Sequence, residues 1–163
     1  RPLYRAYLGT GGRRIKTTEP AMPLPIEEAV AELANSDNPL LNSRLTELSN
    51  LSSTEQGAFE GLWAVIETKR RYQIVYRLVE LTEDNLPLNF DGIFRYCLRD
   101  KDSEVRHKAT EGLWENEDAS LINPLINLLE QDSSAKVQVA AATVLGKFVI
   151  LAEYNKSRSC HLE

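Results

Sequence analysis

An internal repeat sets the strongest limit on how this chain can fold. Six positions of one segment match six positions of the next in residue type, each pair 32 residues apart: Ile93, Cys97, Asp100, Val105, Ala109 and Leu113 against Leu125, Leu129, Asp132, Val137, Ala141 and Leu145. A period of this length is typical of proteins built from stacked supersecondary units. One such unit cannot bury its apolar surface alone, so we expect the core to form between neighbouring units.

The apolar residues follow the 3.6-residue period of α-helices from residue 26 onward. We expect eight helices in antiparallel pairs, near residues 26–34, 38–48, 53–67, 69–81, 89–99, 104–115, 119–131 and 135–153. Pro124 falls close to the first turn of its helix, where proline is tolerated. No segment shows convincing strand alternation, so the sequence predicts an all-α fold.

Helix starts are marked by capping residues. Asn38, followed by a proline, is expected to cap the second helix. Ser53 and Gln56 have the spacing of a capping box. Ser103 and Ser134 are expected to cap the helices that follow them.

A third, weaker copy of the repeat is expected upstream. Residues 58–63 resemble residues 109–114 in sequence, including Trp63 and Trp114, at an offset of 51. The longer offset predicts either an extra helix near residues 69–83 or an irregular pairing there. In the regular copies, Ala109 and Ala141 are small enough to let two helices approach closely.

These residues lead to a known family. Residues 98–109, with Asp100 in the turn and Val105-Arg106 in the second helix, resemble the HEAT-repeat consensus. Residues 131–146 look like the next copy, but Gln138 stands where the family has arginine, so we expect an incomplete Asp–Arg ladder. The whole segment 24–153 is similar to bacterial HEAT-repeat proteins. The resemblance implies a short right-handed α-solenoid of about four antiparallel helix pairs, and it says little about activity.

Composition limits the class of protein. The chain has 163 residues, 42% of them apolar, with only two cysteines. These values favour one globular domain and disfavour a disordered chain or a disulfide-stapled miniprotein. With no run near twenty apolar residues and no export signal, we expect no membrane span and a cytoplasmic protein.

Charge is distributed unevenly, which suggests boundaries. Residues 1–24 carry a net charge of +4 and residues 25–163 a net charge of −9. We expect an irregular basic leader over 1–24, upstream or vector-derived before Met22, a repeat domain over 25–155, and a tail over 156–163 that ends in cloning residues. The acidic body makes nucleic-acid binding unlikely by charge.

Several residues could carry chemistry, but a structural role is expected for most. Asp100 and Arg106 are expected to pair and brace the turn, and Cys97 to be a core thiol. Trp63 and Trp114 are expected to pack between repeats. The run 69–71, Lys-Arg-Arg, is expected to be a solvated face that meets an acidic repeat.

The helix at 135–153 is apolar on nearly all sides, so we expect further chain or another subunit to cover it. The sequence shows no nucleophile–base pair, no cofactor fingerprint and no metal-ligand spacing.

We therefore predict a non-enzymatic protein–protein interaction module without catalytic, cofactor or metal residues. Its partner would be another protein or a larger parent chain. The predicted partner-binding surface comprises Arg106, His107, Lys108, Glu111, Trp114, Lys136, Gln138 and Lys147. Two alternatives remain open: a nucleic-acid-binding HEAT-like protein, and a lyase or chaperone for a tetrapyrrole protein.

Overall fold

A computed structural model describes residues 26–85 and 87–160, with side chains to residue 156. The basic leader and the last three residues lie outside the described residues. Within the described ranges the chain forms eight α-helices, one 3₁₀ turn and no strand. These elements are α1 (Ile26–Ala34), α2 (Asn42–Thr46), α3 (Ser53–Trp63), α4 (Thr68–Asp84), α5 (Asp91–Cys97), α6 (Ser103–Gly112), η1 (Ala119–Leu121), α7 (Ile122–Gln131) and α8 (Ala135–Cys160).

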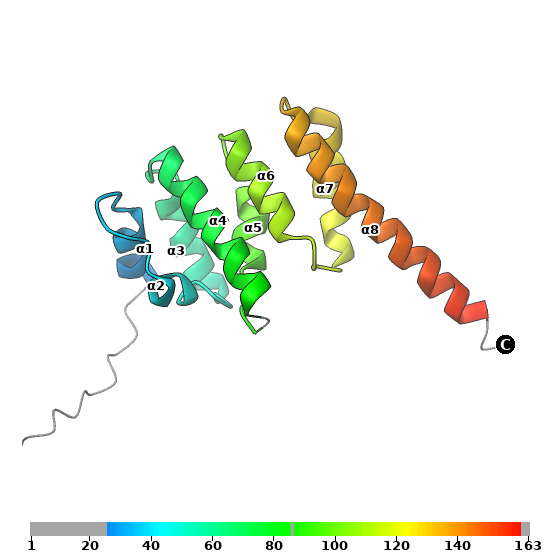
Figure 1. The fold of residues 1–163 in the computed structure, drawn as a ribbon, viewed down its shortest axis with the longest axis horizontal. Coiled ribbons are helices and arrows are strands. Elements are labelled where there is room, and N and C mark those ends of the chain that lie inside the picture. The colour runs from blue at the N-terminus through cyan, green and yellow to red at the C-terminus, as the bar shows by residue number, and fades with distance from the viewer. Residues whose placement is uncertain (1–25, 86, 161–163) are drawn as a thin grey trace, which may run out of the picture.

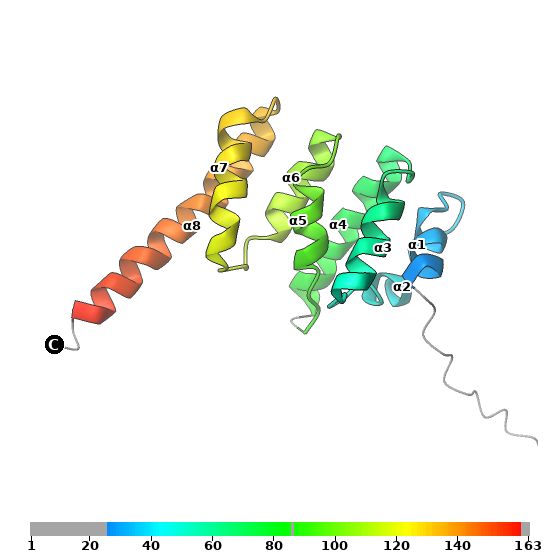
Figure 2. The ribbon, with the colours of Figure 1, turned by 180° about the vertical axis from the view of Figure 1, so that it is seen from behind.

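The helices form two layers (Figure 1). Helices α4, α6 and α8 lie side by side in one layer, where α4 contacts α6 and α6 contacts α8. Helices α1, α3, α5 and α7 form the other layer, which faces the viewer in Figure 2. Helices α5 and α6 pack as a pair, as do α7 and α8. This arrangement confirms the predicted all-α solenoid.

One apolar core runs through the whole stack. It extends from Val30 in α1 to Val144 in α8 without a break. Cys97 is fully buried in it and is a free thiol, which confirms its predicted place in the core. Burial raises the pKa of the Cys97 thiol well above its usual range, so this sulfur is poorly suited to nucleophilic chemistry.

Several helix starts differ from the predictions by one residue. The capping box joins Ser52 and Glu55: the Ser52 hydroxyl accepts from the Glu55 amide, and the Glu55 carboxylate accepts from the Ser52 amide. Asp102, and not Ser103, caps α6 and accepts from two backbone amides. In both places a carboxylate takes part, because charged acceptors complement the amides of a helix start better than neutral ones.

The second helix also starts later than expected. It begins at Asn42, after an extended Leu41, so Asn38 does not cap it. The Asn38 carbonyl instead accepts a hydrogen bond from Arg70 of α4. This contact ties the α1–α2 connection to α4.

The weak third copy was misaligned by sequence similarity. Residues 58–63 lie in α3, which belongs to the layer of α1 and α5, whereas residues 109–112 lie in α6 of the other layer. Helix α4 is therefore no insertion, because it occupies in its repeat the place that α6 occupies in the next. Gly112 shows the difference: a Cβ there would lie 2.8 Å from the Phe94 ring, while a Cβ at Gly61 would meet nothing within 4 Å.

Helix α8 is longer than predicted and projects beyond the stack (Figure 1). It continues to Cys160, through residues assigned to the tail. Its first half is packed, with Val137, Ala141 and Val144 buried. Val139, Val149 and Ile150 are 63–70% exposed, so nothing in the described chain covers them. That further chain or another subunit covers this helix stays a prediction.

The length and composition of α8 also bear on membranes. Residues Ala135–Lys156 are long and apolar enough to cross a bilayer by those two criteria. The sequence-based exclusion counted only uninterrupted apolar runs and missed this helix. Its packed first half is equally typical of a core helix in a soluble domain.

Candidate interaction surface

The side chains that join consecutive repeats define the geometry of the candidate surface. The Asp100 side chain is 3% exposed and accepts a hydrogen bond from Arg71 Nη2 at 3.2 Å, while Arg71 Nε lies 3.0 Å from the same carboxylate as an ion-pair contact. It also accepts from the Trp63 indole at 2.7 Å. The predicted Asp100–Arg106 side-chain pair is wrong, because the Asp100 carboxylate is paired with Arg71 of the preceding repeat.

The run of cations at residues 69–71 is solvated only at Lys69, which is exposed. Arg70 and Arg71 are 4% and 7% exposed. Arg71 also donates to the Ile66 carbonyl, and Arg70 donates to the Leu33 and Asn38 carbonyls. The prediction of an acidic partner in a neighbouring repeat holds for Arg71 alone, through Asp100.

Arg106 repeats the role of Arg71 one unit further along. Its guanidinium donates to Asp132 through Nε at 2.7 Å and Nη2 at 2.8 Å. These hydrogen bonds lower the pKa of the Asp132 carboxyl, in spite of its burial. Only 12% of the Arg106 side chain is exposed, so this residue stacks repeats and is withdrawn from the predicted partner-binding surface.

Gln138 has no charge to contribute to such a bridge. Its amide donates to the Asp132 carbonyl of its own repeat, as Arg106 donates to the Asp100 carbonyl. Gln138 therefore keeps the hydrogen bond to a backbone carbonyl of its own repeat that Arg106 also makes, but it forms no ion pair with a following repeat. This confirms that the ladder is incomplete at Gln138.

The two tryptophans have different environments. Trp63 is 3% exposed and packs against Phe59, with ring centroids 5.0 Å apart. Trp114 is 43% exposed, and the Lys147 ammonium lies 5.6 Å from its ring centroid. Packing between repeats is confirmed for Trp63, whereas Trp114 lies on the surface, where α8 contacts it through Lys147.

The remaining residues of the predicted surface belong to α6, to the turn after it, or to α8. We call the surface that they form the α4–α6–α8 face: His107, Lys108, Glu111, Trp114, Lys136, Gln138 and Lys147. Lys108 bonds Glu111 at 2.9 Å and lies 4.9 Å from the Tyr76 ring centroid of α4. His107 is within 3.9 Å of Glu111, and Lys136 bonds Glu104 at 3.0 Å. Most cations on this face thus have an acidic neighbour, which lowers its attraction for polyanions.

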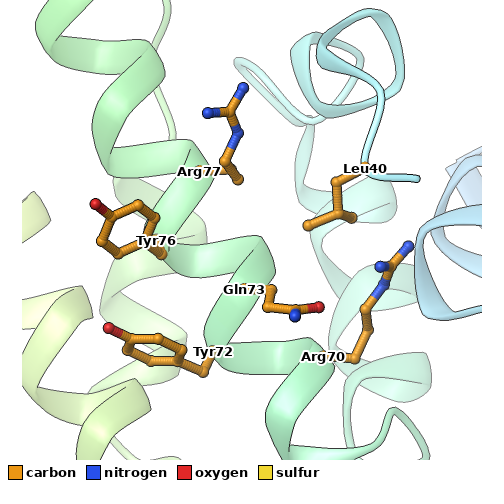
Figure 3. Close-up of a pocket in the computed structure, with 6 residues that line it drawn as sticks. All are labelled: Leu40, Arg70, Tyr72, Gln73, Tyr76 and Arg77. Atoms are coloured by element: carbon orange, nitrogen blue, oxygen red, sulfur yellow. The ribbon is translucent and has the colours of Figure 1, made fainter. Parts of the chain in front are cut away.

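The sequence-based prediction did not include a pocket of about 400 Å³ beside this face, between the α1–α2 connection and α4. Its lining residues are shown in Figure 3: Leu40, Arg70, Tyr72, Gln73, Tyr76 and Arg77. Tyr72 and Tyr76 are one helical turn apart, on the side of α4 away from Ile74 and Leu78 of the core. In the sequence, the sign of this pocket was the pair of tyrosines at that spacing outside the apolar stripe of the helix.

Metal chemistry has no visible support in the described part of the chain. There, no group of three or more His, Cys, Asp or Glu side chains is placed to hold a metal ion.

The fold and its side-chain ladder define an α-solenoid of stacked helix pairs. The family model described as HEAT repeats matches residues 92–158, which span α5 to α8. The resemblance seen in the sequence is thereby confirmed over residues 92–158. Comparison with curated proteins and with solved structures found no match.

Proposed function

We propose that this chain is a non-enzymatic interaction module that presents its α4–α6–α8 face to another protein or to a larger parent chain, in the cytoplasm. HEAT repeats generally mediate protein–protein interaction or scaffolding, and they are typically non-enzymatic. The free, buried thiol of Cys97 fits a reducing compartment.

One observation carries the proposal. Exposed aromatic side chains lie on consecutive repeats of the same face, Tyr76 at 39% exposure on α4 and Trp114 at 43% after α6. Tyrosine and tryptophan are enriched at protein interfaces, where they supply large contact areas at low entropic cost. Both rings are oriented by lysines from the next helix.

Nucleic-acid binding is less well supported by the same surface. Lys108 and Lys136 bond Glu111 and Glu104. Neutralising a phosphate backbone needs cations without such partners.

Affinity capture from lysate with the whole chain as bait tests the proposal. One variant bait carries Glu111→Lys on the α4–α6–α8 face, and a matched control carries Glu130→Lys, at an exposed position of α7 in the other layer. We expect a partner that the parent and control baits retain and the Glu111→Lys bait loses. A partner lost only by the Glu130→Lys bait would place binding in the other layer.

A further inference from the structure

The pocket between α4 and the α1–α2 connection has an unusual composition for this acidic protein. Its six lining residues include two arginines and no acid, and one of the arginines, Arg77, is paired with Glu80. The body of the chain, residues 25–163, has a net charge of −9. An arginine-lined pocket in a negative body is a local feature that an anionic group would recognise.

Arg70 is the less compensated of the two arginines. The residue is 4% exposed, and its guanidinium bonds the Leu33 carbonyl at 2.6 Å and the Asn38 carbonyl at 2.8 Å. In the described part of the chain, no carboxylate lies within ion-pair distance of it. Carbonyl groups at the end of α1 stabilise a cation only in part, because they carry partial charge.

Arg77 is held at the rim from both sides. Its Nη1 donates to Glu80 at 2.7 Å and its Nη2 to the Asn42 side-chain oxygen at 2.8 Å. About two-fifths of its side chain remains exposed. A fixed guanidinium loses little conformational entropy when it binds a further carboxylate.

Tyr72 and Tyr76 give the pocket an apolar wall. Their ring centroids lie 6.0 Å apart, and both rings border the side opposite Leu40 in Figure 3. Gln73 projects between these two sides of the pocket. Arginine, tyrosine and leucine together can hold an acidic side chain beside an apolar one.

We propose that this pocket binds an acidic peptide segment of the partner, with a carboxylate directed to Arg70 and Arg77 and a neighbouring apolar side chain on Tyr72 and Tyr76. The inference rests on the proposed function and names the partner's chemistry. The open pocket of about 400 Å³ suits a few side chains of an extended segment.

Fluorescence anisotropy with the full chain tests this proposal. The probe is a labelled peptide, Gly-Glu-Leu-Asp-Phe-Glu-Gly, and its twin carries Gln and Asn in place of the acids. We expect binding below about 1 mM, at least about tenfold weaker for the twin, and weaker at higher salt. Similar binding of the twin, or none of the acidic peptide, would overturn the proposal.

Variants locate the binding on the chain. We expect Arg77→Gln and Tyr76→Ala each to weaken the acidic peptide about fivefold or more. Arg95→Gln is the matched control, because Arg95 is another half-exposed arginine with an acidic partner, Asp118, away from the pocket. Circular dichroism and thermal unfolding verify that all three variants fold.

Two outcomes separate this inference from the proposed function. If the captured partner depends on Glu111 but the peptide is indifferent to Arg77 and Tyr76, the pocket inference falls and the interaction module stands. If a mixed-sequence oligonucleotide binds more tightly than the peptide and depends on the same two residues, the pocket belongs to nucleic acid and both proposals are wrong.

Discussion

Two arginine–aspartate bridges join consecutive repeats, and they differ in which residues donate to each aspartate. Asp100 accepts from Arg71, from the Trp63 indole and from the Asp102 amide. Asp132 accepts from Arg106 and from the Ser134 amide. Each aspartate accepts three hydrogen bonds, from three residues at the junction with the less regular sequence and from two at the regular one, so regularity of a repeat does not measure the strength of its packing.

The largest effect is expected from removing the carboxylate that also bonds a buried indole. Asp100→Ala leaves the Arg71 charge and the Trp63 indole buried without their acceptor and should lower the free energy of unfolding by about 3–5 kcal/mol. Asp132→Ala should cost less, about 2–3 kcal/mol, because its loss leaves the Arg106 charge but no buried indole without an acceptor. Urea unfolding measures both.

Asp118→Ala is the control for this pair. Asp118 is 59% exposed and bonds Arg95, so its loss should cost below about 1 kcal/mol. An Asp132→Ala variant less stable than Asp100→Ala would contradict the ranking of the two bridges.

The next effect separates two glycines that the sequence makes look equivalent. Gly112→Ala places a Cβ 2.8 Å from the Phe94 ring and should destabilise the protein by about 1–3 kcal/mol. Gly61→Ala meets open space inside helix α3 and should stabilise it by about 0.5–1 kcal/mol. Thermal unfolding measures the direction of the stability change for each variant. Changes in the same direction would mean that the two glycines are equivalent, as their sequences suggest.

A third test compares the two tryptophans. Trp63→Phe keeps an aromatic ring but removes the hydrogen bond to Asp100, at a cost of about 1–3 kcal/mol. Trp114→Phe should cost below about 0.5 kcal/mol, because the ring is at the surface and its contact with Lys147 is exposed. Fluorescence of the two variants checks the environments: emission should be blue-shifted when Trp63 alone remains.

The smallest effect is a dependence on pH. The hydrogen bond from Arg106 lowers the pKa of Asp132 in the folded state below its unfolded value of about 3.9. Its contribution is therefore complete above that value and is lost as pH falls through the folded pKa. In denaturant titrations below about pH 4, Asp132→Asn should lose stability less steeply than the parent protein. Parallel curves would mean that other carboxyls carry the acid sensitivity.

The sequence predicts helices and core well because both depend on periodic apolar residues. The 3.6-residue period places α4 and α8, and the 32-residue offset places Val105 and Val137 at equivalent buried positions. The sequence does not predict which side chains pair with each other when the partners lie far apart in the chain. Nothing local tells whether Asp100 will meet Arg71 or Arg106, since the two arginines approach from different repeats.

The candidate surface was harder to predict for the same reason. Arg106 has a side chain of the kind that binds partners, but its guanidinium is already paired with Asp132. Tyr72 and Tyr76 lie near Leu40 only because α2 packs beside α4, a contact between segments that have no repeat similarity.

The bridges also give the stack a direction. Each arginine reaches forward, Arg71 to Asp100 and Arg106 to Asp132, so both of these junctions have a cationic donor side and an anionic acceptor side. The series of forward ion pairs ends at Gln138, which has no charge and bonds the Asp132 carbonyl of its own repeat. Anything that docks beyond α7 and α8 at that position therefore has no need of a buried carboxylate, and a neutral hydrogen-bonding or apolar surface would fit there better than an acidic one.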